Sequence, residues 1–148
     1  MSLEFSKQKF FIVYVVVSLV LFGLRLIVKN NNLFISILAF LGFFFFIGFF
    51  IYSGLKMKEQ SFNFKSIAAF SAFTSGITSV VLSILLFFIS KLYIQPHVHN
   101  VKLLPHNEYL MILLISLILG IIFEILISIL LAYLGTKLYK SDTNKTDI

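Results

Sequence analysis

The sequence predicts an all-α integral membrane protein, an antiparallel four-transmembrane-helix bundle, and two observations lead to that prediction. Hydrophobic residues make up 59% of the 148 residues and charged residues only 12%, far outside the usual composition of a soluble domain. Four long apolar runs also fill most of the chain. Inside lipid, every backbone N–H and C=O must be paired within its own segment, so an apolar run of about 20 residues becomes a helix. One helical domain, residues 1–148, accounts for the chain.

The first predicted span covers residues 10–28 and follows Lys7 and Lys9. It is too long for a secretory signal, and no small-x-small cleavage site follows it, so we expect it to stay in the mature protein. A short turn of asparagines separates it from the second span, residues 33–55. Because the turn is short, these two spans are expected to pack antiparallel.

The third and fourth spans are predicted at residues 67–90 and 110–133. A basic loop, residues 56–66, leads into the third span, and the longest loop of the chain separates the third from the fourth. That loop contains Pro96 and Pro105, which argue against a continuous helix. The polar tail, residues 141–148, is expected to fray and to lie in the cytoplasm.

Lysine and arginine are divided unequally between the two sides of the predicted bundle. One side carries Lys7, Lys9, Lys56, Lys58, Lys65, Lys137, Lys140 and Lys145. The other side carries Arg25, Lys29, Lys91 and Lys102. The positive-inside rule therefore predicts both termini in the cytoplasm, with the protein in the inner (cytoplasmic) cell membrane. Anionic lipid headgroups are a sufficient partner for the net charge of +6, and nucleic acid is not needed.

Small and polar residues recur every four positions on the third and fourth spans, and residues four apart share one face of a helix. The stripe on the fourth span consists of Ser116, Gly120, Glu124, Ser128 and Ala132. The stripe on the third span consists of Ser71, Ser75, Ser79 and Ser83. Small residues let helix backbones approach closely, and hydroxyls can form hydrogen bonds across the contact. We therefore expect the two stripes to face each other as a packing seam.

Glu124 is the one residue that packing alone does not explain, because an ionised side chain at the bilayer centre costs at least about 3 kcal/mol. Counting about 1.5 Å of rise per residue places several hydroxyls near its depth. These candidate neighbours are Ser18, Ser75, Thr78 and Ser79. Arg25 is the cation inside a predicted span, but it lies near the outer end and is expected to extend outward to the interface.

Three interpretations of Glu124 stay open from the sequence. The first is a protonated carboxyl group that is hydrogen-bonded inside the bundle, and desolvation favours it. The second is a proton or cation site in a transport path. The third is a contact to another subunit. Small multidrug transporters also combine four short spans with a membrane carboxylate, but theirs lies in the first span, so only a chemical analogy remains.

The sequence predicts no cofactor, no metal and no enzymatic activity. His97, His99 and His106 in the outer loop form a weak candidate for copper or zinc, and a solvated loop is the expected alternative. The chain has no Gly-rich phosphate loop, no His-Glu-x-x-His and no Gly-x-Ser-x-Gly. An intramembrane hydrolase would need a histidine or lysine at the depth of a serine, and the predicted spans contain neither.

Three short stretches resemble a family of small four-span membrane proteins that are common in Bacteroidota. They are Tyr52-Ser-Gly-Leu-Lys56, Phe62-Asn-Phe-Lys65-Ser-Ile-Ala-Ala-Phe70 and Tyr93-Ile-Gln-Pro96. Members have a similar Gly-Ile/Leu-Lys exit from the second span and a Phe-x-Lys-Ala-Phe-like entry to the third. The resemblance covers the middle of the chain and leaves the histidine-bearing loop unmatched. It implies a four-span architecture and supplies no activity and no site residues.

We therefore expect a small membrane protein that acts by association, as an accessory or scaffold subunit of a membrane complex. Its expected partners are the lipid bilayer and other membrane subunits or further copies of itself. The alternative is a small proton- or cation-coupled transporter that uses Glu124, as an oligomer, because one four-helix bundle has little room for a lined path. A holin-like pore-former fits less well. The two main hypotheses differ at Glu124→Gln, which an accessory subunit tolerates and coupled transport does not.

Overall fold

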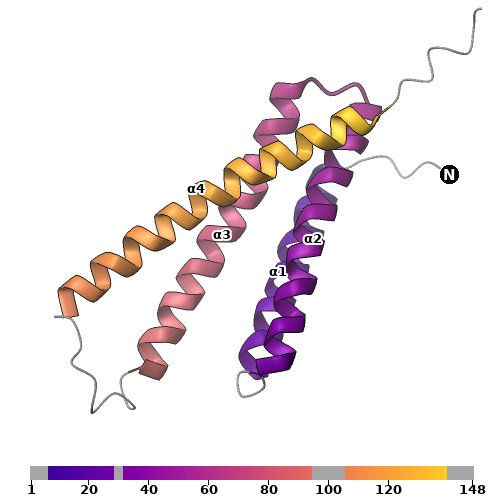
Figure 1. Ribbon diagram of the computed structural model, residues 1–148. Coiled ribbons are helices and arrows are strands. Elements are labelled where there is room, and N and C mark those ends of the chain that lie inside the picture. Colours follow the sequence, from indigo (N-terminus) through magenta and orange to yellow (C-terminus); the bar gives the residue numbers. More distant parts are fainter. Residues whose placement is uncertain (1–6, 29–31, 95–105, 140–148) are drawn as a thin grey trace, which may run out of the picture.

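The computed structural model describes residues 7–28, 32–94 and 106–139, which form four α-helices (Figure 1). The helices are α1 (Lys7–Ile27), α2 (Asn32–Glu59), α3 (Phe64–Ile94) and α4 (His106–Leu138). All four are long and apolar enough to cross a membrane. The all-α prediction is confirmed, with four candidate membrane-spanning helices.

The helices continue into the polar residues that border the apolar runs. The end of α2 extends through Lys56 to Glu59, which form an ion pair with 2.6 Å between Nζ and Oε2. Glu59 is exposed and Lys56 is partly exposed, so water screens this pair and it contributes little to stability. As a result, the connection between α2 and α3 is shorter than the predicted basic loop, with only residues 60–63 lying between the two helices.

Capping hydrogen bonds end α2 and begin α3 on either side of their connection. The N–H of Phe62 donates to the carbonyl of Met57 (3.0 Å), and the N–H of Ser61 donates to that of Lys58 (2.9 Å). This is a Schellman pattern, and it places Ser61 in the left-handed region with φ of 62°. Asn63 then caps α3, because its Oδ1 accepts from the N–H of Ser66 at 2.8 Å.

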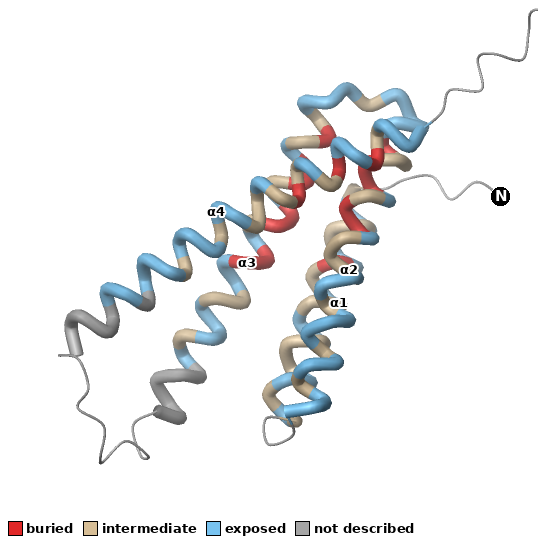
Figure 2. Tube along the Cα trace, viewed as in Figure 1, coloured by how far each residue is buried: buried red, intermediate tan, exposed pale blue. Residues whose placement is uncertain are grey.

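The buried residues concentrate in the half of the molecule that contains the α2–α3 connection (Figure 2). One core cluster consists of Met57, Ile67, Phe70 and Ala132. A second cluster consists of Tyr14, Phe49 and Phe50. The ring of Tyr14 packs on Phe49 with 4.7 Å between centroids and on Phe50 with 5.1 Å. Aromatic contacts therefore join α1 to α2, whereas α4 packs on α2 and α3.

The crossing of α2 and α4 depends on two buried glycines. A Cβ on Gly54 would collide with the backbone carbonyl of Ala132, and a Cβ on Gly135 would collide with that of Ile51. The same Cβ on Gly135 would also lie 3.0 Å from the backbone nitrogen of Leu55. Backbone therefore touches backbone at this crossing, the kind of approach that small residues permit between membrane helices.

Several helix ends that carry lysine lie close together. Lys7 at the start of α1 donates to Ser66 Oγ near the start of α3 (2.8 Å), and its Nζ lies 4.5 Å from the centroid of the Phe62 ring. Phe64 packs edge-on against Tyr133, near the end of α4, with 5.5 Å between centroids. The start of α1, the start of α3 and the end of α4 thus meet at one end of the molecule.

Candidate functional site

Serine hydroxyls join α3 to α4. The Oγ atoms of Ser75 and Ser128 lie 2.9 Å apart, and both side chains are buried. Each hydroxyl also contacts backbone carbonyls, Ser75 that of Ser71 at 2.9 Å and Ser128 that of Ile125 at 2.8 Å. Such bonds let a polar group sit between helices without an unpaired donor. These hydroxyls therefore link the two helices along the seam.

The stripe predicted on the fourth span divides into three parts in the structure. Ser128 contacts α3, and Ala132 lies at the crossing with α2. Ser116 and Gly120 are exposed, and a Cβ built on Gly120 would meet no atom within 4 Å. The seam thus covers only the part of the stripe nearest the buried half, and Gly120 borders open space instead.

Glu124 lies next along the seam, where the Oγ of Ser79 donates a hydrogen bond to its carboxylate Oε2. Ser79 is buried, whereas Glu124 is half-buried. Glu124 lies inside the candidate membrane span of α4, ten residues from Leu114 and fourteen from Leu138. At about 1.5 Å per residue this is about 15 Å and about 21 Å of rise, which places the carboxylate far from either end of the span.

The other three predicted neighbours of Glu124 make different contacts. Ser75 pairs with Ser128, and Thr78 donates to the backbone carbonyl of Thr74 at 2.8 Å. Ser18 lies on α1, on the wall of the cavity that Glu124 also lines. Among the described residues, Ser79 is the one of these four candidates whose hydroxyl donates a hydrogen bond to Glu124.

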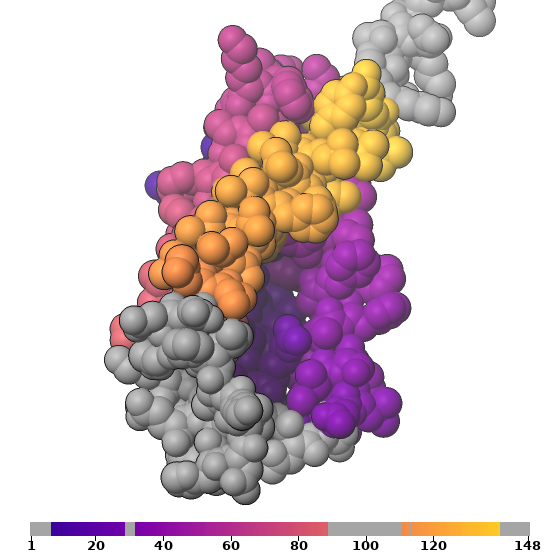
Figure 3. All heavy atoms as spheres, turned by 60° about the vertical axis from the view of Figure 1, so that its left-hand side comes forward, coloured from indigo at the N-terminus to yellow at the C-terminus, as the bar shows by residue number. Residues whose placement is uncertain are grey.

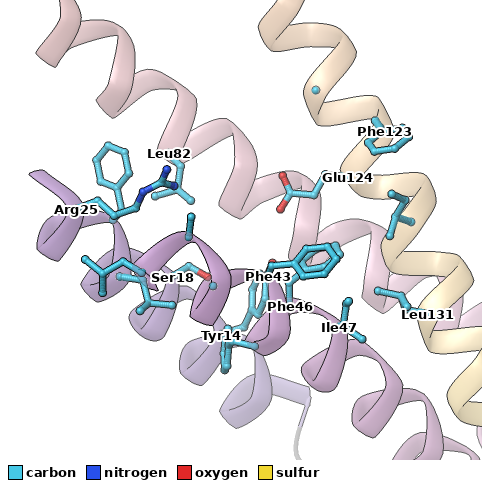
Figure 4. Close-up of a pocket in the computed structure, with 18 residues that line it drawn as sticks. Tyr14, Ser18, Arg25, Phe43, Phe46, Ile47, Leu82, Phe123, Glu124 and Leu131 are labelled. Atoms are coloured by element: carbon cyan, nitrogen blue, oxygen red, sulfur yellow. The ribbon is translucent and has the colours of Figure 1, made fainter. Parts of the chain in front are cut away.

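A cavity of about 600 Å³ separates α4 from α1 and α2, and Glu124 points into it (Figure 4). Figure 3 shows the hollow between α4 and α2, with α1 behind it. Four side chains on the wall carry polar or charged groups: Tyr14, Ser18, Arg25 and Glu124. Aromatic rings make up much of the remaining wall, namely Phe22, Phe43, Phe45, Phe46 and Phe123. Leu82 is the contribution of α3.

Arg25 lines the same cavity as Glu124. Its position on α1 is eleven residues beyond that of Tyr14, which also borders the cavity. Eleven residues correspond to about 16 Å of helical rise, so the cavity is elongated along α1 and Arg25 marks its end near the α1–α2 connection. The side chain is exposed, and Figure 4 shows it on the cavity wall apart from Glu124.

The histidine positions add no site in the described part of the chain. His97 and His99 lie outside the described residues, and His106 begins α4, although its side chain is not described. Among the residues that the structure describes, no group of three His, Asp or Glu side chains could hold a metal ion. The metal hypothesis therefore stays a prediction about residues 95–105 and their neighbours.

Two features of the structure were missed from the sequence. One is the contact of Gly54 and Gly135 with backbone, and the other is the cavity itself. Gly54 lies five residues before Glu59, within an apolar run whose phenylalanines obscure any small-residue stripe. The sequence did contain a signal for this contact, because one glycine lies near the end of the second span and another lies near the end of the fourth.

Comparisons with known proteins give no relative to argue from. No protein-family model matches the chain, and no curated protein and no solved structure matches it significantly. The resemblance to the Bacteroidota family therefore stays a prediction.

The carboxylate of Glu124 has two different surroundings, the hydroxyl of Ser79 on one side and the cavity on the other. The hydrogen bond from Ser79 satisfies part of the carboxylate from the protein side. The cavity on the other side leaves room for a proton, a cation or a donor group from another molecule. No serine, histidine and acid come together as a nucleophilic set among the described side chains around the cavity. The Glu124 carboxylate can therefore take part in binding from the cavity side.

Proposed function

We propose that the protein is an integral membrane protein in which α1 to α4 cross the cytoplasmic membrane as an antiparallel bundle with both termini inside. The lysine-bearing ends support this orientation, because Lys7 lies beside Ser66 and the end of α4 lies beside Phe64. Lys56, Lys58 and Lys65 belong to the same region of the chain. A cluster of lysines at one end is typical of the cytoplasmic face.

We propose that this membrane protein acts by association, as an accessory or scaffold subunit of a membrane complex. The observation that carries the proposal is the low burial of three helices: only 6% of the most apolar stretch of α1, α2 and α4 is buried, against 33% for α3. Away from the tight α2–α4 crossing, these helices leave wide faces open, and those faces are available to lipid and to other subunits. Phe40, Phe43 and Phe44 on α2 are exposed rings of the kind that membrane helices use for packing.

The test is purification from the native membrane in mild detergent, with mass spectrometry of the components that remain bound. Association predicts a partner present at fixed stoichiometry through two orthogonal affinity steps. A photoreactive phenylalanine at Phe40, which is 64% exposed, should cross-link to that partner, whereas the same group at Phe50, which is 0% exposed, should not. Recovery of the protein alone, without cross-links at either position, would contradict the proposal.

A second candidate function is proton- or cation-coupled transport, and the position of Glu124 on the cavity wall favours it. A transport site must expose its carboxylate to a path, and a carboxylate enclosed by packing on all sides cannot serve. Proton flux into proteoliposomes that contain the purified protein tests this function. Transport predicts flux that Glu124→Gln abolishes and Glu59→Gln leaves intact, because Glu59 is a surface acid at the end of α2. Equal proton flux in the parent protein, Glu124→Gln and Glu59→Gln would rule out coupled transport.

A further inference from the structure

We propose that the cavity between α4 and the α1–α2 pair binds a lipophilic organic cation, with Glu124 as its counter-ion and the surrounding aromatic rings as its walls. The inference goes beyond association and names a ligand class for the second candidate function. It rests on the position of Glu124, the aromatic lining and the size of the cavity.

Charge is the first argument for a cationic ligand. Glu124 is the acidic side chain on the cavity wall, and Ser79 hydrogen-bonds to one of its oxygens from within the α3–α4 seam. Burying an unpaired carboxylate is unfavourable, and a cation placed beside it compensates the charge. Glu124 points toward the cavity in Figure 4, so a ligand there can reach it without moving a helix.

The aromatic lining is the second argument. Phe43 and Phe46 lie across the cavity from Glu124 in Figure 4, and Phe22, Phe45, Phe123 and Tyr14 also line it. Organic cations with apolar substituents bind to the faces of aromatic rings through the ring quadrupole, and aromatic cages recognise quaternary ammonium groups in this way. A small inorganic cation would gain little from such a lining, because it needs several oxygen ligands.

The size of the cavity is the third argument, because it suits a small ligand. The cavity of about 600 Å³ falls in the range of about 300 to 1,000 Å³ that is common for sites of drug-sized molecules. A compact amphiphile therefore fits this volume.

Arg25 defines the orientation of the ligand. It lies at the end of the cavity near the α1–α2 connection, away from the Tyr14 end. Like charges repel, so the positive group of the ligand should settle at Glu124 and its apolar part should extend along the phenylalanines. An anionic amphiphile would bind in the opposite sense, with its charge at Arg25, and this is the competing occupant that the experiment must exclude.

The experiment measures binding of radiolabelled tetraphenylphosphonium to the purified full-length protein in lipid nanodiscs. The matched anion tetraphenylborate, which has nearly the same size and shape, serves as the charge control. We expect saturable binding of the cation, at least a tenfold loss of affinity in Glu124→Gln, and little displacement by tetraphenylborate. Glutamine can still accept the hydrogen bond from Ser79, so this variant should fold.

Two glycine variants test whether the ligand occupies this cavity. A Cβ on Gly120 or on Gly48 would meet no atom within 4 Å, but only Gly120 lines the cavity. Gly120→Leu should therefore reduce cation binding at least tenfold by filling the space, whereas Gly48→Leu should leave it unchanged. Equal binding in both variants would overturn the proposal.

The remaining outcomes also decide the question. Non-saturable uptake of tetraphenylphosphonium, or unchanged affinity in Glu124→Gln, would overturn the cation site. Saturable binding of tetraphenylborate that Arg25→Gln removes would replace it with an anion site. None of these results bears on partner copurification, so failure of the cation site and failure of the association function are distinguishable. Proton flux without cation binding would likewise retain transport and reject this ligand.

Discussion

Ser79 on α3 donates a hydrogen bond to the carboxylate of Glu124 on α4, which joins the two helices at a point far from either end of the α4 span. On the Ser79 side the carboxylate meets a packed seam of hydroxyls. On the other side it meets a cavity of about 600 Å³. Glu124 therefore lies between a seam and a cavity, and the predictions below separate the roles of its surroundings.

Gly54→Ala should strongly destabilise the protein. A Cβ at this position would collide with the carbonyl of Ala132, and backbone cannot move aside as a flexible side chain can. Overpacking a tight contact costs about 1 to 3 kcal/mol, and this collision belongs at the upper end. Detergent unfolding followed by circular dichroism measures the loss. Gly23→Ala, where a Cβ would meet no atom within 4 Å, is the control and should remain as stable as the parent protein.

The pair of hydroxyls Ser75 and Ser128, with 2.9 Å between their Oγ atoms, should show measurable coupling. Hydrogen bonds between membrane helices contribute about 0.6 kcal/mol on average and about 1.7 kcal/mol at most. A double-mutant cycle with Ser75→Ala and Ser128→Ala should give a coupling energy in that range. Ser36→Ala, which removes a hydrogen bond within α2, should show no coupling to Ser128→Ala. Coupling of equal size in both cycles would show that the seam pair does not interact directly.

Phe50→Ala should destabilise the α1–α2 pair more than Phe40→Ala. Phe50 is fully buried against Tyr14 and Phe46, whereas Phe40 faces outward. Truncation of a buried phenylalanine in a packed core costs about 3 to 5 kcal/mol because it leaves a cavity. Thermal unfolding in the same detergent compares the two variants. If they lost equal stability, the aromatic cluster around Tyr14 would not be a core.

Glu124→Gln should leave stability nearly unchanged, and Glu124→Lys should not. The amide oxygen of glutamine can accept the hydrogen bond from Ser79, but an ammonium group has no acceptor. The lysine would also place a second cation in the cavity that Arg25 lines, and a charge at the centre of a span costs at least about 3 kcal/mol. The yield of monodisperse protein after membrane extraction reports the difference. Equal recovery of the two variants would mean that this hydrogen bond is dispensable.

The sequence predicted the helical class because apolar runs and their lengths are local properties. Counting residues along each span selected four hydroxyls as candidate neighbours of Glu124, and Ser79, which donates to it, was one of them. Which hydroxyl donates depends on the rotation of α3 about its axis, and this is a property of packing. For the same reason, the spacing of Ser116 and Gly120 could not show that they lie beyond the seam.

The close crossing of α2 and α4 and the cavity could not be predicted from local sequence patterns, for a further reason. Gly54 and Gly135 belong to helices that are not adjacent in sequence, so no turn length or spacing connects them. The cavity exists because α4 contacts α2 near Gly54 while residues closer to the start of α2, such as Gly42, line the cavity instead. That divergence is set by the crossing geometry of whole helices.

The central claim is that this chain crosses a membrane with its lysine-bearing end in the cytoplasm, and single-cysteine labelling tests it most directly. The chain has no cysteine of its own, so each introduced thiol reports one position. The informative variants are Asn32→Cys and Lys58→Cys at the two ends of α2, both exposed, and Leu119→Cys on an exposed part of α4. An impermeant maleimide on intact cells should label Asn32→Cys at once, Lys58→Cys only after permeabilisation, and Leu119→Cys in neither condition. Labelling of Lys58→Cys from outside would invert the orientation, and ready labelling of Leu119→Cys would contradict membrane insertion.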